Sequence, residues 1–283
     1  MSAGTDSAAF CAQLVRNQDF ERYAATLFVP AEHRRALLAL YAFNAEVSRV
    51  HEHVSQPLPG EIRLQWWTDM LAGAGHGDVE GNPVAAELLL AIRTHDLPVD
   101  RLTKLVDAHV FDLYNDPMPD LAVLESHIND TSSTLFALAA RILGHASDPI
   151  EQAADHGGLA QGVVRLIATL PYDAARRQMF IPQDMLIQNG GSAAEVYAGK
   201  LTPSIRGTLD QLISGAQEQL ATAMALLPEI PAEARRAFLP LALVARDLER
   251  MSAAGHDPFV LIAPSRLRTL WTLWRASMSK AFS

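Results

Sequence analysis

The sequence has a single cysteine, Cys11, among its 283 residues. One cysteine excludes an intramolecular disulfide and any metal centre built from several cysteines, and it fits a reducing compartment. No apolar run approaches the roughly 18–20 residues that a helix needs to cross a bilayer. The first 20 residues also lack the basic start and apolar run of a secretory signal. We therefore expect a cytoplasmic protein, or one that lies peripherally at the inner membrane.

Basic residues are also scarce. Lys and Arg number 23 against 32 for Asp and Glu, which gives a net charge of −9 with neutral histidines. A chain this acidic is a poor candidate for nonspecific binding to nucleic acid, so we expect no nucleic-acid partner. No glycine-rich loop follows a strand, which leaves dinucleotide binding without support. The ten histidines are scattered along the chain. His51 and His53 lie two apart, a spacing that points them away from each other on a helix, so we expect no zinc site.

The pattern that the sequence does contain is helical. Apolar residues recur at three- and four-residue steps, prolines and glycines separate the segments, and no convincing alternating strand occurs. This predicts helices near 31–54, 61–71, 84–95, 99–114, 120–143, 148–170, 193–199, 204–227, 233–254 and 264–281. We interpret residues 1–283 as one all-α helical bundle, with 1–18 as a flexible or peripheral start and 73–83 as a mobile, glycine-rich connection.

We interpret the segment 155–184 as the one around which the rest of the chain is organised. Its apolar face consists of Val163, Leu166, Ile167 and Leu170, which recur at helical spacing. The adjoining face carries a polar row at four-residue steps: Gln161, Arg165, Thr169 and Asp173. Pro171 predicts a kink or a stop at the end of this helix, because proline removes a backbone donor. The row either faces water on a half-exposed helix or faces an interior site.

A second polar face lies on the predicted helix 31–54, where helical spacing groups Tyr41, Asn44, Ser48 and Glu52. We predict that the two polar faces line one interior cavity. Arg165 should then pair with Asp173 or Glu52, because a buried guanidinium without a partner is costly.

Several segments, in order along most of the chain, resemble the squalene/phytoene synthase family. They are Leu27-Phe28-Val29-Pro30-Ala31-Glu32-His33-Arg34, Leu40-Tyr41-Ala42-Phe43-Asn44, Pro59-Gly60, Leu64-Gln65-Trp66-Trp67 and Phe180-Ile181-Pro182. The resemblance implies a bundle of the isoprenoid (terpenoid) synthase type. Enzymes of this family join two prenyl diphosphates head to head, and two aspartate-rich segments hold the Mg²⁺ that neutralises the diphosphate leaving group.

The sequence departs from the family in both of these segments. Where the first would read Asp-Asp-x-x-Asp, this chain reads Ser48-Arg49-Val50-His51-Glu52. The places of the second fall on Gly162, Arg165, Ala168, Thr169 and Asp173. Arg49 and Arg165 would repel a metal cluster, so we expect no metal, no cofactor and a catalytically inactive pseudoenzyme. The alternative is a Mg²⁺-dependent prenyl transferase of isoprenoid biosynthesis with divergent ligands, namely Glu46, Glu52 and Asp173.

The altered segments resemble the non-enzymatic branch of the family, the mitochondrial complex I assembly factors and their bacterial relatives. Four short segments carry this resemblance: Phe43-Asn44-Ala45-Glu46, Ala160-Gln161-Gly162-Val163-Val164, Pro171-Tyr172 and Arg176-Arg177. It implies an assembly or scaffold factor for the respiratory NADH dehydrogenase, with complex subunits or other assembly proteins as partners. It also leaves room for a lipid or isoprenoid in the central cavity.

Three smaller features complete the predictions. Trp66 and Trp67 are expected in the core, with the lining of an apolar cavity as the alternative. Asp130, Ser132 and Ser133 lack a histidine at triad spacing, so helix capping explains them better.

The third feature is the basic segment 265–282, whose cations are Arg266, Arg268, Arg275 and Lys280. Its apolar stripe, formed by Leu267, Leu270, Trp271, Trp274 and Met278, either closes the core or also makes weak peripheral contact with anionic membranes.

Overall fold

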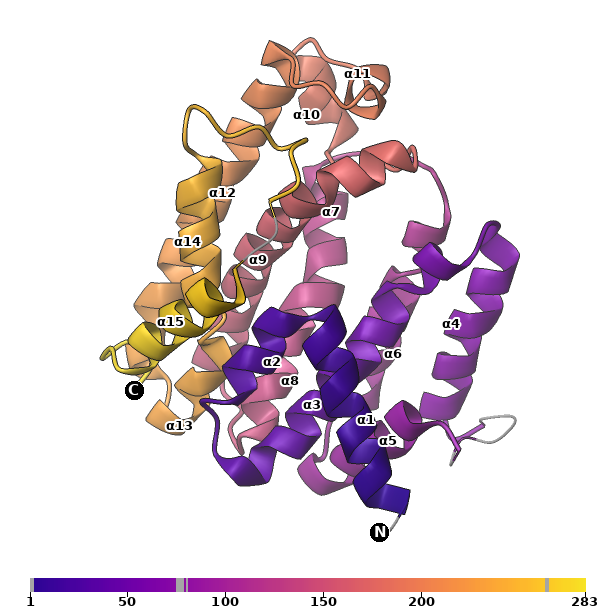
Figure 1. Cartoon of the computed structure of the whole chain (residues 1–283), viewed down its shortest axis with the longest axis vertical. Helices are drawn as coiled ribbons and strands as arrows, with labels where there is room; N and C mark the ends of the chain where they lie inside the picture. The colour runs from indigo at the N-terminus through magenta and orange to yellow at the C-terminus, as the bar shows by residue number, and fades with distance from the viewer. Residues whose placement is uncertain (1–2, 75–78, 80, 263–264) are drawn as a thin grey trace.

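The computed structural model describes residues 3–74, 79, 81–262 and 265–283, and within these residues it contains helices and no strand (Figure 1). The α-helices are α1 (Ala3–Gln18), α2 (Phe20–Thr26), α3 (Ala31–Ser48), α4 (Pro57–Leu71), α5 (Pro83–His95), α6 (Val99–Ala108), α7 (Leu121–Ile128), α8 (Thr134–Ile142), α9 (Asp148–Ala175), α10 (Gln183–Gln188), α11 (Ala193–Tyr197), α12 (Pro203–Leu226), α13 (Ala232–Arg235), α14 (Leu241–Met251) and α15 (Arg266–Ser277). Short 3₁₀ turns are η1 (Val50–His53), η2 (Phe111–Leu113), η4 (Leu227–Glu229) and η5 (Arg236–Phe238), and η3 (Asn129–Ser133) is a π-helical turn. The predicted all-α class is confirmed.

Local sequence signals explain where many of these helices begin. Asn82 precedes α5, and its side chain accepts hydrogen bonds from the backbone N–H groups of Val84 and Ala85. Thr202 caps α12 in the same way, and Ser192 with Glu195 forms a capping box at α11. These caps satisfy backbone donors that the first turn of a helix leaves free.

The longest helix, α9, runs through the middle of the bundle (Figure 1). It packs against α12 and α14 on one side and against α8 and η3 on another. The buried apolar side chains form one connected core that reaches from Cys11 in α1 to Phe282 near the last residue. Among the described residues, no helix has the length and apolar character needed to span a bilayer.

Close approach of α9 to η3 depends on a glycine. A Cβ atom added to Gly158 would lie 2.4 Å from the Cα of Ser133, a distance that real Cβ atoms essentially never show. Ser132 and Ser133 are therefore buried inside a continuous helical stretch, and the Ser133 hydroxyl donates to the Asp155 carbonyl at 3.2 Å. The prediction that Ser132 and Ser133 cap a helix is wrong, because tertiary packing against α9 keeps this segment helical.

Other predictions about the helices differ from the structure in detail. Helix α9 continues past Pro171 to Ala175, because tertiary packing that buries Asp173 and Ala174 outweighs the cost of the proline, so of the predicted kink or stop the stop is wrong. Residues 3–18, expected to form a flexible or peripheral start, form α1, which packs on α3 and α5 and buries Cys11 and Val15. Trp67 is in the core as predicted, edge-on to Phe43 at 5.2 Å.

Residues 75–78 and 80 of the predicted mobile connection lie outside the described residues, as does Pro264 at the start of the predicted last helix.

Candidate functional site

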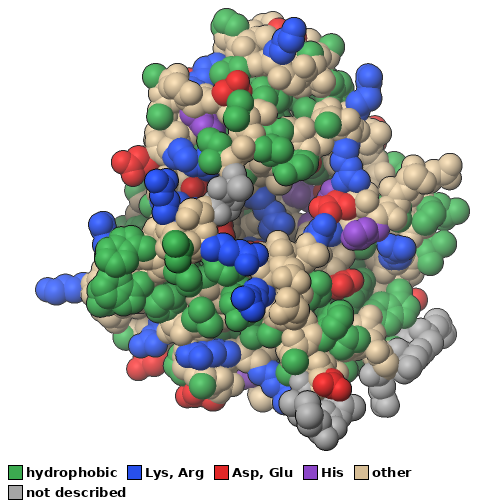
Figure 2. Space-filling model, in the orientation of Figure 1, with side chains coloured by type: hydrophobic (Ala, Val, Ile, Leu, Met, Phe, Trp, Pro, Cys, Tyr) green, Lys and Arg blue, Asp and Glu red, His purple; other side chains and the backbone are tan. Residues whose placement is uncertain are grey.

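A cavity of about 990 Å³ lies among the C-terminal end of α3, the turns η1 and η2, the α7–η3–α8 stretch and the C-terminal half of α9. Figure 2 shows a hollow near the centre of one face of the molecule, with arginine or lysine and histidine side chains around it. Apolar and polar side chains share the lining. A cavity of this size is large enough to enclose an organic ligand rather than a few waters.

Six of the eight residues predicted to face a cavity line this one: Asn44, Ser48, Glu52, Arg165, Thr169 and Asp173. The polar ends of α3 and α9 are thus brought together. Tyr41 and Gln161 do not belong to the lining. The Gln161 side-chain oxygen instead accepts a hydrogen bond from Arg22 at 2.8 Å, and the Arg22 guanidinium lies over the Tyr41 ring at 5.5 Å from its centroid. Arg22, on α2, is a partner that the pattern of α3 and α9 could not reveal.

Glu52 and Asp173 already have partners. The Glu52 carboxylate forms an ion pair with Arg49 at 2.5 Å, and its backbone carbonyl accepts from Arg176 at 3.2 Å. The Thr169 hydroxyl donates to Asp173 at 2.7 Å. Burial raises the pKa of Asp173 to about 6, although the Thr169 hydrogen bond acts in the opposite direction.

Arg165 therefore lacks both predicted partners, and the prediction that it pairs with Asp173 or Glu52 is wrong. Within the described residues, its guanidinium makes no hydrogen bond or ion pair, although it lines the cavity. Burial lowers the pKa of Arg165, and the nearby charge of Arg22 lowers it further. An arginine never loses its proton under ordinary conditions, so the site keeps an unpaired positive charge.

A histidine–aspartate cluster in the cavity lining was missed by the sequence reasoning. His109 follows α6, and its Nδ1 lies 2.5 Å from a carboxylate oxygen of the buried Asp112. The other Asp112 oxygen lies 3.7 Å from Nε2 of His127, and His51 of η1 lines the same cavity. Burial favours a higher pKa for Asp112, but His109, through charge and a hydrogen bond, and then His127 and His51 hold this pKa below its ordinary value.

The only local signal for this cluster was the spacing of His109 and Asp112. Histidine and aspartate three apart meet on one face of a helix, but such pairs are common on solvated faces. The approach of His127 from α7 depends on tertiary packing. The backbone carbonyl of Asp112 is also fixed by Gln178, whose amide donates to it at 2.8 Å.

Several buried polar atoms point to the cavity as a binding site. Six buried side-chain nitrogen or oxygen atoms in the described part of the chain lack a hydrogen-bond partner in the protein. Four of them belong to residues that line this cavity: Ser48 Oγ, His51 Nδ1, His109 Nε2 and Asp112 Oδ1. Buried polar groups without partners are rare in folded proteins, so their concentration in one place indicates where a polar ligand group would be held.

The family model for squalene/phytoene synthase matches residues 15–275, nearly the whole chain. The chain belongs to the squalene/phytoene synthase family. NADH dehydrogenase (ubiquinone) complex I, assembly factor 6 of Rattus norvegicus is 31% identical over 254 residues, covering 90% of this chain and 76% of that protein. Phytoene synthase 2, chloroplastic, of Solanum lycopersicum is 23% identical over 262 residues, covering 88% of this chain and 83% of that protein.

Solved structures of this family share the fold. Squalene synthase HpnC from Alicyclobacillus acidocaldarius superposes with a TM-score of 0.75 at 20% identity, covering 90% of this chain and 97% of that one. This likeness establishes that the chain has the isoprenoid synthase fold. At such low identity it says nothing about activity.

The residues of this family member do not fit a Mg²⁺ cluster. Glu46 of the alternative ligand set is exposed and lines a separate pocket with Phe10 and Trp66, so it does not join Glu52 and Asp173. Of these two, Glu52 is neutralised by Arg49, and the unpaired cation Arg165 shares the cavity. Magnesium favours several free carboxylate oxygens in near-octahedral geometry. In the described part of the chain, no three potential ligand side chains are grouped for a metal.

Proposed function

We propose that this chain is an assembly or scaffold factor for the respiratory NADH dehydrogenase and that it does not transfer prenyl groups. The observation that carries the proposal is its 31% identity, over 90% of its length, to a protein named as a complex I assembly factor. The identity to a phytoene synthase is lower, at 23%. Its partners would be subunits of the complex or other assembly proteins, met in the cytoplasm or at the inner membrane.

The chemistry of the cavity supports the loss of prenyl transfer. Ionisation of a prenyl diphosphate needs divalent cations to neutralise the charge that develops on the leaving group. Here serine and arginine, Ser48 and Arg49, stand where the first aspartates of the enzymes would be, and Arg165 stands in the second segment. An arginine can bind a phosphate directly, but it also repels the cations on which the reaction depends.

The proposal includes an amphipathic ligand, a lipid or isoprenoid with an anionic head. Arg165, Ser48 and His109 offer a positive charge and unpartnered polar atoms for the head. The apolar part of the lining would hold the tail, and it consists of Leu124, Ile128, Leu135, Leu166 and Phe180. Direct recognition by an arginine would hold such a head without a metal.

A genetic experiment tests the assembly role. The gene is removed from its own cells, and assembled NADH dehydrogenase is measured by native electrophoresis and by NADH:quinone activity. We expect both to fall and to recover with the wild-type chain. The double variant Glu52→Gln, Asp173→Asn should restore them equally, because assembly would not depend on metal-binding carboxylates. Unchanged complex after gene removal would contradict the proposal, and failure of the double variant alone would favour a prenyl transferase.

A binding experiment tests the ligand. The purified protein is titrated calorimetrically with farnesyl monophosphate in the presence of a chelator. We expect binding that is weakened roughly 10- to 100-fold by Arg165→Gln, since hydrogen bonds to charged groups contribute about 1.5–3 kcal/mol. Arg93→Gln, at an exposed arginine of α5, is the matched control and should bind normally. No binding, or equal weakening by both variants, would contradict the proposed cavity ligand.

A further inference from the structure

The C-terminal part of the chain exposes a row of large apolar side chains. Trp271 is 62% exposed and Trp274 is 44% exposed, and their ring centroids lie 4.8 Å apart. Leu267 and Met278, the residue that caps the C-terminal end of α15, are also exposed, and all four follow one another at three- and four-residue steps. Figure 2 shows apolar side chains gathered where α15 lies in Figure 1. Contiguous apolar patches of this kind mark interaction sites.

This row does not close the core. The inward face of α15 consists of other residues, Thr269 and Leu273, which are almost completely buried. Leu270 is partly buried against the same core. The prediction that the stripe closes the core is therefore wrong for its exposed members Leu267, Trp271, Trp274 and Met278, because helix rotation places Thr269 and Leu273 inward.

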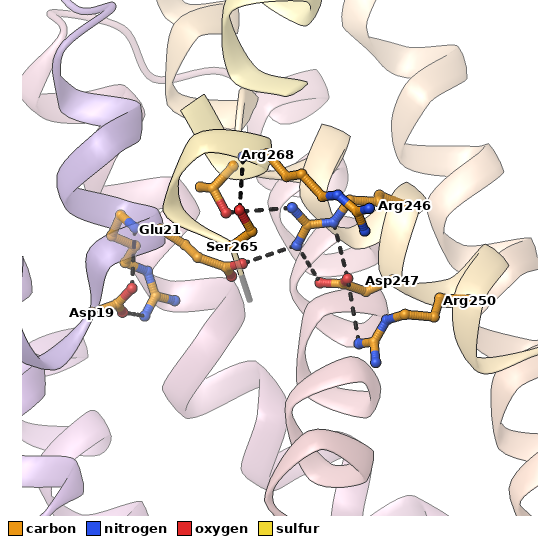
Figure 3. Close-up of polar contacts among 9 residues, drawn as sticks. Asp19, Glu21, Arg246, Asp247, Arg250, Ser265 and Arg268 are labelled. Atoms are coloured by element: carbon orange, nitrogen blue, oxygen red, sulfur yellow. Dashed lines mark hydrogen bonds and ion pairs between the residues drawn. The ribbon is translucent and has the colours of Figure 1, made fainter. Parts of the chain in front are cut away.

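Polar contacts fix α15 in this orientation (Figure 3). Arg246 of α14 reaches Glu21 of α2 at 3.1 Å, Asp247 at 2.9 Å and the Thr269 hydroxyl at 3.4 Å. Ser265 accepts from the backbone N–H of Arg268 and so caps the helix. On the bundle side, the Arg266 guanidinium lies 4.7 Å from the centroid of the Phe20 ring. The apolar row is thus presented on a helix held by α2 and α14.

The segment that carries the row is positively charged, although the whole chain carries −9. Residues 265–283 contain four cations and no Asp or Glu. Arg268 and Arg275 are exposed and lie beside the apolar row, each one residue after Leu267 and Trp274. Tryptophans next to arginines on an exposed helix face are typical of elements that lie in a membrane interface and attract anionic lipids.

A second exposed apolar segment lies next to the cavity. Val260, Leu261 and Ile262 precede α15 and are all exposed, and Leu261, at 53% exposure, also lines the cavity. An exposed apolar segment that also lines an internal cavity is suited to a lipid surface, from which a lipid tail can enter without crossing water.

We infer that the surface formed by residues 260–262 and the exposed face of α15 docks on anionic phospholipid membranes. The tryptophans insert at headgroup depth, and Arg268 and Arg275 contact the lipid phosphates. This inference stands apart from the assembly role, because it depends only on the exposed face and its charge.

Vesicle flotation of the full chain tests the inference. The probes are vesicles of phosphatidylcholine alone and of phosphatidylcholine with phosphatidylglycerol, each at low and high salt. We expect binding to the anionic vesicles at low salt, and release by high salt. Trp271→Ser with Trp274→Ser should weaken this binding on the order of 100-fold, because apolar area is lost from the interface. Arg268→Gln with Arg275→Gln should weaken it roughly 30-fold.

The matched control removes apolar surface from a different face. Leu58→Ser with Ile62→Ser changes two exposed residues of α4 and should leave vesicle binding unchanged. Circular dichroism checks that every variant is folded. Equal binding of wild type and the tryptophan variant, or no binding to either vesicle, would overturn the inference. A dimer in sedimentation that the tryptophan variant dissociates, without vesicle binding, would overturn it in favour of a second copy of the chain.

Discussion

Two neighbouring arginines, Arg22 and Arg165, differ in the partners that the protein gives them. Arg22 of α2 donates to Asp19 at 2.9 Å and to Gln161 at 2.8 Å, and its guanidinium lies over the Tyr41 ring. Arg165, one helical turn after Gln161 on α9, finds no partner among the described residues. The comparison separates a polar group that holds the fold from one that is free to bind the proposed ligand.

The polar row of α9 is therefore divided in function. Gln161 serves the buried contact with Arg22, whereas Arg165, Thr169 and Asp173 line the cavity. Four-residue spacing places all four on one face and cannot separate them. What separates them is the approach of α2, which the sequence pattern of α9 does not encode.

The largest effect is expected from Arg22→Met. The substitution leaves the Asp19 carboxylate without its ion pair in a largely buried place, where breaking a pair costs about 3–5 kcal/mol. Arg22 and the nearby Arg165 normally outweigh the burial that would raise the pKa of Asp19, and they hold it below its ordinary value. Urea denaturation at neutral pH should show a loss of about 3 kcal/mol in the free energy of unfolding. A loss below about 1 kcal/mol would mean that the Arg22 cluster is not structural.

A smaller effect is expected from Asp173→Asn, and it depends on pH. The folded-state pKa of Asp173 is raised to about 6 from 3.8, so the folded protein holds the proton more tightly than the unfolded chain. The wild type should lose stability as pH rises from about 4 to above 6, where the buried carboxyl ionises. Asparagine keeps an oxygen that can accept from Thr169 but cannot ionise.

The variant should therefore be more stable than wild type at pH 8 by about 2 kcal/mol, and this difference should vanish near pH 4. Paired urea denaturation curves at the two pH values measure it. A difference that is the same at both pH values would show that Asp173 does not titrate as described.

The smallest effect on stability is expected from Arg165→Met. Because this residue is exposed to the solvent of the cavity and its guanidinium has no partner among the described residues, its removal should leave the free energy of unfolding unchanged or raise it by up to about 1 kcal/mol. Thermal denaturation of Arg165→Met and Arg22→Met under the same conditions compares the two effects on stability directly. If Arg165→Met destabilises the protein as much as Arg22→Met, the cavity arginine has a structural role and the comparison fails.

Much of the fold could be predicted from the sequence, because it depends on local patterns. Helical periodicity and proline positions indicated the helices, and the ordered segments from residue 27 to residue 182 indicated the family. The polar ends of α3 and α9 were also predicted to meet, and Asn44, Ser48, Glu52 and Asp173 line one cavity.

The features that were missed arise from tertiary contacts. His109, Asp112 and His127 come from three successive segments and meet only when α6 packs against η3, the turn that follows α7. Glu46 lies near Glu52 in sequence, yet the rotation of α3 places it on a different face. The inward face of α15 was misassigned because threonine at 269 is buried there, while two tryptophans are exposed.

The central claim is that the synthase fold is kept here without prenyl transfer, and one assay tests it most directly. The purified chain is incubated with Mg²⁺ and with farnesyl or geranylgeranyl diphosphate, and extracted products are analysed by mass spectrometry against a heat-inactivated sample. The account predicts no squalene- or phytoene-like product above that background. Product that requires Mg²⁺ and disappears in Glu52→Gln or Asp173→Asn would contradict it.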